Sequence, residues 1–187
     1  MTQIFTGIGL GLRGAAIGSA GLGQWGTALS VNAANGNVVM RQSDGFLADF
    51  GVSLDLFQSY NSQQGGTWQF NLGTRLAIQG AANTVGSLVN RTDEDGHVSR
   101  FVYDARLHAY VAEDGGLARL TFDGSSWCYK EGTGQTCCIY NLDGQLTQLR
   151  DSNQHVLQCH YEHGVLTCIS DVDRQQSITW TFRDGLL

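Results

Sequence analysis

The stretch YNLDGQLT, residues 140–147, decides the fold, because its pattern returns twice along the chain at a regular spacing. YEHGVLT at residues 161–167 is a copy one residue shorter, and FRDGL at residues 182–186 opens a third. Three aromatic positions lie 21 residues apart, and three leucines lie 20 apart: Tyr140, Tyr161 and Phe182, then Leu146, Leu166 and Leu186. A period of this length predicts a repeat protein.

Each repeat unit is expected to be one β-hairpin of about twenty residues. Because an isolated hairpin is only marginally stable in water, neighbouring units must pair edge to edge and stack their aromatic and leucine side chains. The six repeat positions are therefore predicted to be structural residues that hold the sheet together. The fold class predicted is all-β, an antiparallel hairpin meander forming a curved, repeat-built sheet.

The remainder of the chain supports the all-β prediction. It has 25 glycines and no proline, so turns must be made by Gly and by Asn or Asp, as in tight hairpins. Alternating apolar residues predict strands, and no stretch has a helical period. Expected strands cover residues 27–33, 37–42, 52–56, 68–72, 101–103, 117–122, 157–161 and 178–182. Expected turns lie at Asn35-Gly36, Asp95-Gly96, Asp114-Gly115, Asp123-Gly124, Asp143-Gly144 and Asp184-Gly185.

Composition and repeat regularity divide the chain into three segments: a glycine-rich apolar leader over 1–26, a less regular head over 27–90, and hairpin repeats over 91–187. The leader carries Arg13 within its apolar stretch and no basic residues before it, so neither a membrane span nor a signal peptide is expected. Two matches to GxGxxG, at residues 9–14 and 21–26, lack the βαβ context of a dinucleotide site.

Charge and cysteine content exclude several classes of protein. The formal net charge is −6 with no basic run, so no nucleic-acid partner is expected. The five cysteines, an odd number, include an adjacent pair, which favours free thiols over a disulfide framework: Cys128, Cys137, Cys138, Cys159 and Cys168.

No catalytic, cofactor or metal site is predicted. Strand alternation would place Cys159 and His163 on one face and His160 and Glu162 on the other, against a tetrahedral zinc site. The acidic stretches at 93–95 and 171–173 lack the other ligands of a calcium loop and favour ordinary turns. No serine has a GxSxG context, so the chain is not expected to be an enzyme.

Residues 140–147 resemble the Rhs, or YD, repeat, whose pattern is Tyr-Asp-x-x-Gly-Arg-Leu; Asn141 and Gln145 depart from it. VNAANGNVV at residues 31–39 is similar to the stretch where Rhs-type regions begin, and YNS at 60–62 looks like the Tyr-Asn-Ser that follows. The resemblance covers about residues 27–187.

The resemblance implies a bacterial protein, made in the cytoplasm and exported without a classical signal peptide, whose β-strip closes into a cocoon around a toxin. Delivery would be by a toxin complex or type VI secretion. The expected partners are the remainder of the shell or a C-terminal shell subunit, the toxin cargo and the secretion machinery. The chain is too short to close a cocoon and has no toxin domain, so a fragment or one subunit of a split shell is expected.

Two other functions stay open from the residues alone. Exposed Trp and Tyr side chains on a sheet could make the chain a cell-surface or carbohydrate-binding module. A small enzyme that uses Cys and His is the other alternative.

Overall fold

The computed structural model describes residues 3–5, 20–22, 27–32, 36–47, 54–63, 65, 68–132 and 136–180. These residues form an all-β protein of antiparallel sheets, and none of them lies in a helix. No helix in this described part is therefore long and apolar enough to cross a membrane. Contacts divide the chain into two units, one of residues 1–47, 55–74 and 91–99 and the other of 48–54, 75–90 and 100–187.

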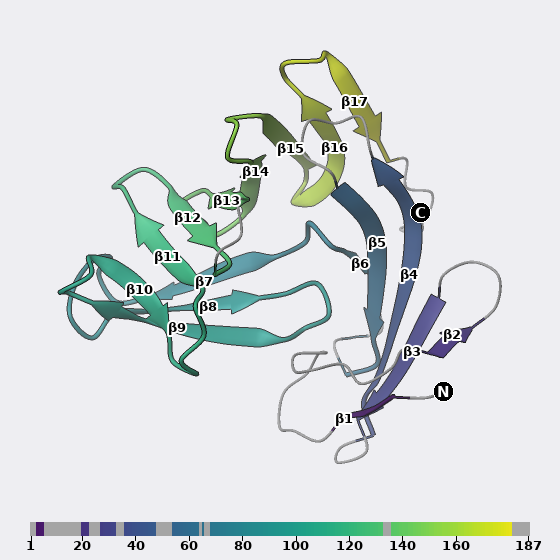
Figure 1. The fold of residues 1–187 in the computed structure, drawn as a ribbon, viewed down its shortest axis with the longest axis horizontal. Coiled ribbons are helices and arrows are strands. Elements are labelled where there is room, and N and C mark those ends of the chain that lie inside the picture. The colour runs from purple at the N-terminus through teal and green to yellow at the C-terminus, as the bar shows by residue number, and fades with distance from the viewer. Residues whose placement is uncertain are drawn as a thin grey trace. The chain divides into compact units, whose positions relative to one another are not determined.

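The first sheet has the order β1-β3-β4-β5-β6, with β2 also paired to β3 (Figure 1). Its strands are β1 Gln3–Phe5, β2 Ala20–Leu22, β3 Thr27–Asn32, β4 Val38–Leu47, β5 Leu54–Asn61 and β6 Trp68–Phe70. The expected strands at 27–33, 37–42, 52–56 and 68–72 are confirmed where they are described, except that β4 begins at Val38 and β6 ends at Phe70, with residues 71 and 72 in a turn. β1 pairs with β3 in parallel, which the prediction of a purely antiparallel meander missed.

Buried polar side chains hold the first unit together. Asn37 and Asn61 are almost fully buried, which requires hydrogen-bond partners. The Ser62 hydroxyl donates to Asn37 Oδ1 at 2.9 Å and accepts from the Val38 backbone N–H at 2.9 Å. The Asn61 side-chain amide donates to the Asp95 carbonyl at 2.6 Å. These bonds fix the ends of β4 and β5 through side chains far apart in sequence.

The second sheet has eleven strands in strictly sequential order from β7 to β17, and neighbouring strands from β9 to β17 are antiparallel (Figure 1). They are β7 Arg75–Gln79, β8 Leu88–Thr92, β9 Val98–Asp104, β10 Ala109–Ala112, β11 Arg119–Phe122, β12 Trp127–Lys130, β13 Cys137–Tyr140, β14 Leu146–Arg150, β15 Val156–Glu162, β16 Val165–Asp171 and β17 Gln176–Thr179. The strands expected at 101–103 and 157–161 are confirmed, the one expected at 117–122 begins at Arg119, and β17 covers the start of the last one. Phe182, Leu186 and Asp184-Gly185 lie outside the described residues, as does most of the leader.

One face of the second sheet carries the core. Directly paired residues point to the same face, and two cross-strand rows on this face are apolar. One row is Phe122, Trp127, Tyr140 and Leu146; the other includes Leu120, Tyr129, Cys138, Leu149 and Leu157. Trp127, Tyr140 and Leu146 are no more than 2% exposed, and the Trp127 ring lies 5.2 Å from Tyr110 and 4.6 Å from Phe122.

Most hairpins of this sheet are closed by an Asp or Asn side chain that hydrogen-bonds the backbone of its own turn. At six turns an Asp or Asn side chain accepts a hydrogen bond from the backbone N–H two residues later, which makes an Asx turn. The acceptors are Asp95, Asp104, Asp114, Asp123, Asn141 and Asp151, and Asp171 does the same before β17. The expected glycine turns are confirmed at 96, 115, 124 and 144, where φ is positive.

The first strand of the sheet also meets a later one. Arg75 of β7 forms an antiparallel bridge with Gln145, just before β14, and the Leu76 N–H donates to the Gly144 carbonyl at 2.8 Å. The Arg75 guanidinium reaches the Gly164 carbonyl at 3.1 Å. Since β7 and β14 are separated by six strands in the order, the sheet bends back on itself to bring them together.

Candidate functional site

The repeat positions that the structure describes lie in the second sheet. Tyr140 is fully buried and pairs across strands with Leu146, which is 1% exposed. Tyr161 is half-buried and pairs with Leu166, which is 6% exposed. Burial raises the pKa of the Tyr161 hydroxyl, so the ring stays neutral. The two described units thus place their aromatic and leucine side chains in equivalent pairs.

Two further features are common to these units. A β-bulge lies directly before each tyrosine, between Ile139 and Tyr140 and between His160 and Tyr161. The threonine after each leucine bonds back to the carbonyl before the bulge, Thr147 to Ile139 at 3.2 Å and Thr167 to His160 at 3.4 Å. A bulge that recurs at one position of a unit bends each hairpin in the same way.

The structure extends this pattern to two earlier hairpins that sequence reasoning missed. Tyr103 pairs with Tyr110 across the β9–β10 turn, and Phe122 pairs with Trp127 across the β11–β12 turn. The signal was an aromatic residue followed by an acidic or amide residue, at Tyr103-Asp104 and Phe122-Asp123 as at Tyr140-Asn141. Unequal spacing hid it, because these aromatics lie 19 and 18 residues before the next one.

A groove lies on the opposite, polar side of the second sheet. Its volume is about 800 Å³, and it runs over β12, β13 and β14 and the turns beside them. The residues that line it are mostly polar: Asp123, Ser125, Ser126, Cys128, Lys130, Cys137, Ile139, Tyr140, Asn141, Thr147, Gln148, Arg150, Asp151, Ser152 and Gln154. No aromatic ring is exposed there, since Tyr140 is fully buried.

Both carboxylates of the groove are bonded within their own turns. Asp123 accepts from the backbone N–H groups and hydroxyls of Ser125 and Ser126, which hold its pKa well below the usual range. Burial acts to raise the pKa of Asp151, but hydrogen bonds from His155 and the Asn153 N–H outweigh it and lower the pKa. Both groups remain ionised and fix the turn backbones.

The cysteines differ from the prediction of free thiols. Cys128 and Cys137 form a disulfide between β12 and β13, with Cα atoms 6.2 Å apart, whereas Cys138, Cys159 and Cys168 are free. The register places Cys128 opposite Ile139 and Cys137 opposite Lys130, so the two cysteines are diagonal neighbours on one face. The separation of nine residues between Cys128 and Cys137 did not by itself predict that they would pair.

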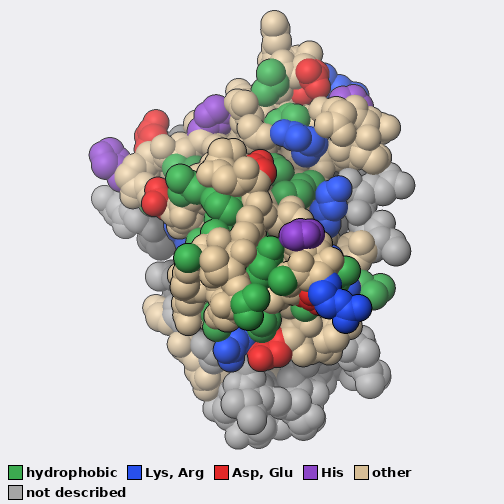
Figure 2. All heavy atoms as spheres, turned by 90° about the vertical axis from the view of Figure 1, so that its left-hand side faces the viewer, with side chains coloured by type: hydrophobic (Ala, Val, Ile, Leu, Met, Phe, Trp, Pro, Cys, Tyr) green, Lys and Arg blue, Asp and Glu red, His purple; other side chains and the backbone are tan. Residues whose placement is uncertain are grey.

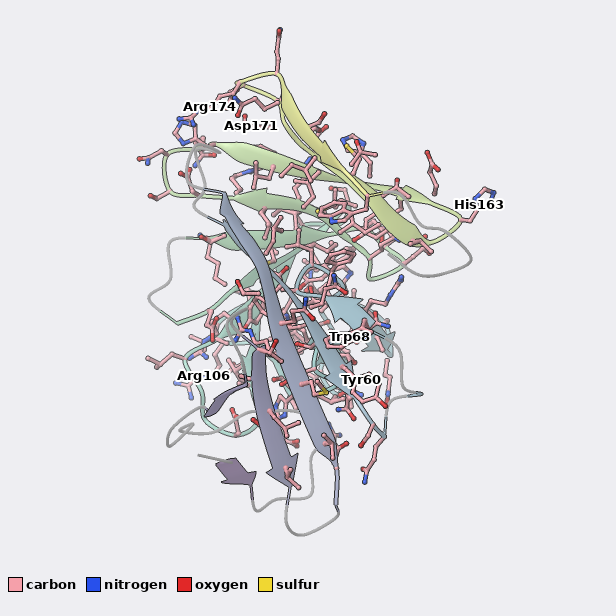
Figure 3. All side chains as sticks on the ribbon, turned by 90° about the vertical axis from the view of Figure 1, so that its right-hand side faces the viewer. Tyr60, Trp68, Arg106, His163, Asp171 and Arg174 are labelled. Atoms are coloured by element: carbon pink, nitrogen blue, oxygen red, sulfur yellow. A yellow bond between two sulfur atoms is a disulfide. The ribbon has the colours of Figure 1, made fainter. Side chains whose placement is uncertain are left out.

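The Cys159–His163 motif does not form a site in the structure. Cys159 is buried, and burial raises the pKa of its thiol to about 12, so the thiolate that a nucleophile or metal ligand needs is disfavoured. His160 hydrogen-bonds the Ser170 hydroxyl at 2.7 Å, and His163 lies at the tip of the β15–β16 turn, pointing outward (Figure 3). Among the described residues, no three His, Cys, Asp or Glu side chains are close enough to hold a metal.

The first unit contributes one aromatic pair. Tyr60 of β5 and Trp68 of β6 are directly opposed, with ring centroids 5.7 Å apart and planes tilted by 51° (Figure 3). Trp68 is 41% exposed. The exposed Trp68 ring, backed by the half-buried Tyr60, is a surface on which a planar or apolar ligand face can stack.

Charged side chains of both signs are dispersed over the face in Figure 2, and Lys and Arg do not gather there in one patch.

A comparison with models of protein families gives no match, and a comparison with curated protein sequences gives none either.

Proposed function

We propose that the chain is a structural segment of an Rhs-type β-shell, which encloses or scaffolds a toxin cargo in a bacterial secreted toxin, and that it has no enzymatic role. The observation that carries the proposal is the hairpin that recurs four times in one sheet. Each copy has an aromatic residue before the turn and a buried apolar partner after it. Recurrence of one pair at every second turn is what a wall made of repeats requires.

The bend of the sheet supports the same proposal. A shell needs curvature, and the contact between β7 and the start of β14 means that eight successive strands return to their own beginning. The bulges before Tyr140 and Tyr161 add bending at the same position in two of the four repeats. The disulfide is in keeping with a chain that works in an oxidising environment outside the cytoplasm.

The last strand of the second sheet, β17, provides the test of the proposed shell role. β17 pairs with β16 on one side, and no described residue pairs with its other side. An uncovered edge of a wall should pair with a further strand. We expect the isolated chain to self-associate with rising concentration in sedimentation velocity, and Ser177→Lys on β17 to abolish the association, because a lysine on an edge strand blocks pairing.

Asn153→Lys, at an exposed turn, is the matched control and should associate like the parent chain. A parent chain that stays monomeric at every concentration would contradict the proposal. Equal behaviour of the two lysine variants would contradict it as well.

A second candidate function, a carbohydrate-binding module, is favoured by the exposed Trp68 ring beside Tyr60. Aromatic rings can stack on the apolar face of a neutral sugar. A glycan array probed with the chain and with Trp68→Ala decides it: saturable binding of a neutral glycan, lost in the variant, would support the module. Identical array profiles would remove this candidate.

A further inference from the structure

We propose that the groove over β12–β14 binds an anionic glycan, a sugar chain that carries carboxylate or sulfate groups. This inference goes beyond the shell role and does not depend on it. It rests on the cations of the groove, on the absence of an ion pair to either of them among the described residues, and on the kind of polar groups around them.

Three cations lie in one cross-strand row. Arg119 is opposite Lys130, Lys130 is opposite Cys137, and Cys137 is opposite Arg150. Residues paired in this way point to the same face, and two strand spacings put Lys130 and Arg150 about 10 Å apart at their Cα atoms. Like charges opposed across strands destabilise a sheet, and a bound anion would relieve that repulsion.

No carboxylate in the described part of the chain forms an ion pair with either cation that lines the groove. Lys130 and Arg150 take part in none of the ion pairs there, which join Arg91 with Asp93, Arg100 with Glu113 and His155 with Asp151. Arg150 donates to the neutral Gln148 side chain at 3.3 Å. The carboxylates of Asp123 and Asp151 stay ionised, but they are bonded within their own turns, and neither forms an ion pair with Lys130 or Arg150.

The remaining lining favours a sugar over a peptide. Hydroxyl and amide groups surround the cations and suit the hydroxyls of a sugar: Ser125, Ser126, Asn141, Gln148 and Gln154. Peptide recognition needs either a free strand edge or pockets for apolar side chains. The groove lies on the face of interior strands, and its apolar members are the half-buried Ile139, the disulfide and the fully buried Tyr140.

The test uses the whole chain and a short oligogalacturonate, a carboxylate-bearing sugar, in isothermal titration calorimetry at low salt. We expect saturable binding, weakened at least about tenfold in the double variant Lys130→Gln/Arg150→Gln, because each lost cation removes a charge-assisted hydrogen bond. Raising the salt concentration should weaken binding to the parent chain, a readout that needs no variant.

Three controls test whether binding is specific to the groove and to an anionic sugar. Arg106→Gln/Arg174→Gln removes the same charge from two other turns of this unit (Figure 3) and should bind like the parent chain. A neutral dextran oligomer should not bind, and Trp68→Ala should leave the oligogalacturonate affinity unchanged. Circular dichroism of each variant verifies the fold.

Several outcomes would overturn the proposal. These are no binding of oligogalacturonate, equal weakening by the Arg106/Arg174 control, or loss of binding in Trp68→Ala. Binding of polyglutamate as tight as that of the sugar would assign the groove to an acidic peptide instead.

Discussion

The two sheets of this chain are stabilised in different ways. The first sheet has strands of up to ten residues, a parallel pair, and polar side chains that bond across 24 or more positions of sequence. The second sheet has short strands in sequential order, and its turns are closed by side chains bonded two residues away. A hairpin closed by hydrogen bonds within its own turn can be repeated along a sheet. A strand pair held by hydrogen bonds between distant residues depends on one particular arrangement of the chain.

The largest difference between the two sheets is expected at their tryptophans. Trp127→Ala should lower the free energy of unfolding by about 3–5 kcal/mol, because the ring is 2% exposed and packs against Tyr110 and Phe122. Trp68→Ala in the first sheet should cost less than about 1 kcal/mol, since that ring is 41% exposed. Urea denaturation of both variants measures the contrast, and similar losses would refute it.

The bend of the second sheet is tested at a glycine. A Cβ at position 144 would lie 2.0 Å from the Leu76 carbonyl oxygen, and φ there is +73°. Gly144→Ala should therefore cost about 2–4 kcal/mol, from strain and from displacement of β7. Gly124→Ala is the matched control: φ is +99° but nothing lies within 4 Å, so only the backbone penalty of about 1–2 kcal/mol applies. Equal losses would mean that β7 does not contact the turn.

The contribution of the Asx turns to stability is tested at Asn141, whose Oδ1 accepts from the Asp143 and Gln145 N–H groups at 3.1 and 2.9 Å. Asn141→Ala removes the acceptor and should cost about 1–2 kcal/mol in thermal or urea unfolding. Asn141→Asp keeps an acceptor in the same place and should be close to neutral. A loss in the Asp variant as large as in the Ala variant would indicate that the amide group, not the oxygen, matters.

An effect that depends on pH is expected in the first unit, at the half-buried Glu94. Burial raises its pKa from 4.5 to about 7, with Asp95 and Asp93 adding to the rise. The folded state then holds a proton that the unfolded state has released, so the free energy of unfolding should fall as the pH rises from about 4.5 to 7. Glu94→Gln should be near neutral at pH 4 and stabilising at pH 8. Parallel stability curves for the variant and the parent would show that Glu94 is not buried.

The sequence predicted those parts of the fold that depend on neighbours along the chain. Strand alternation and Asp-Gly turns identified β9, β11 and β15 and the turns at 96 and 124, because both signals act within a few residues. The β1–β3 pairing, the Cys128–Cys137 disulfide and the contact of Leu76 with Gly144 were not predicted, since each joins segments whose approach depends on the whole sheet. The groove was missed for the same reason. Its cations are Lys130 and Arg150, which meet only through the register with β13.

The central claim is that the second sheet is part of a repeat-built wall. An electron-microscopy reconstruction of the assembly that contains this chain, at a resolution that separates strands, is the decisive measurement. We expect antiparallel hairpins to pair with the side of β17 that no described residue covers, and the sheet to curve around an enclosed volume. A reconstruction in which β17 faces solvent and the sheet encloses nothing would contradict it.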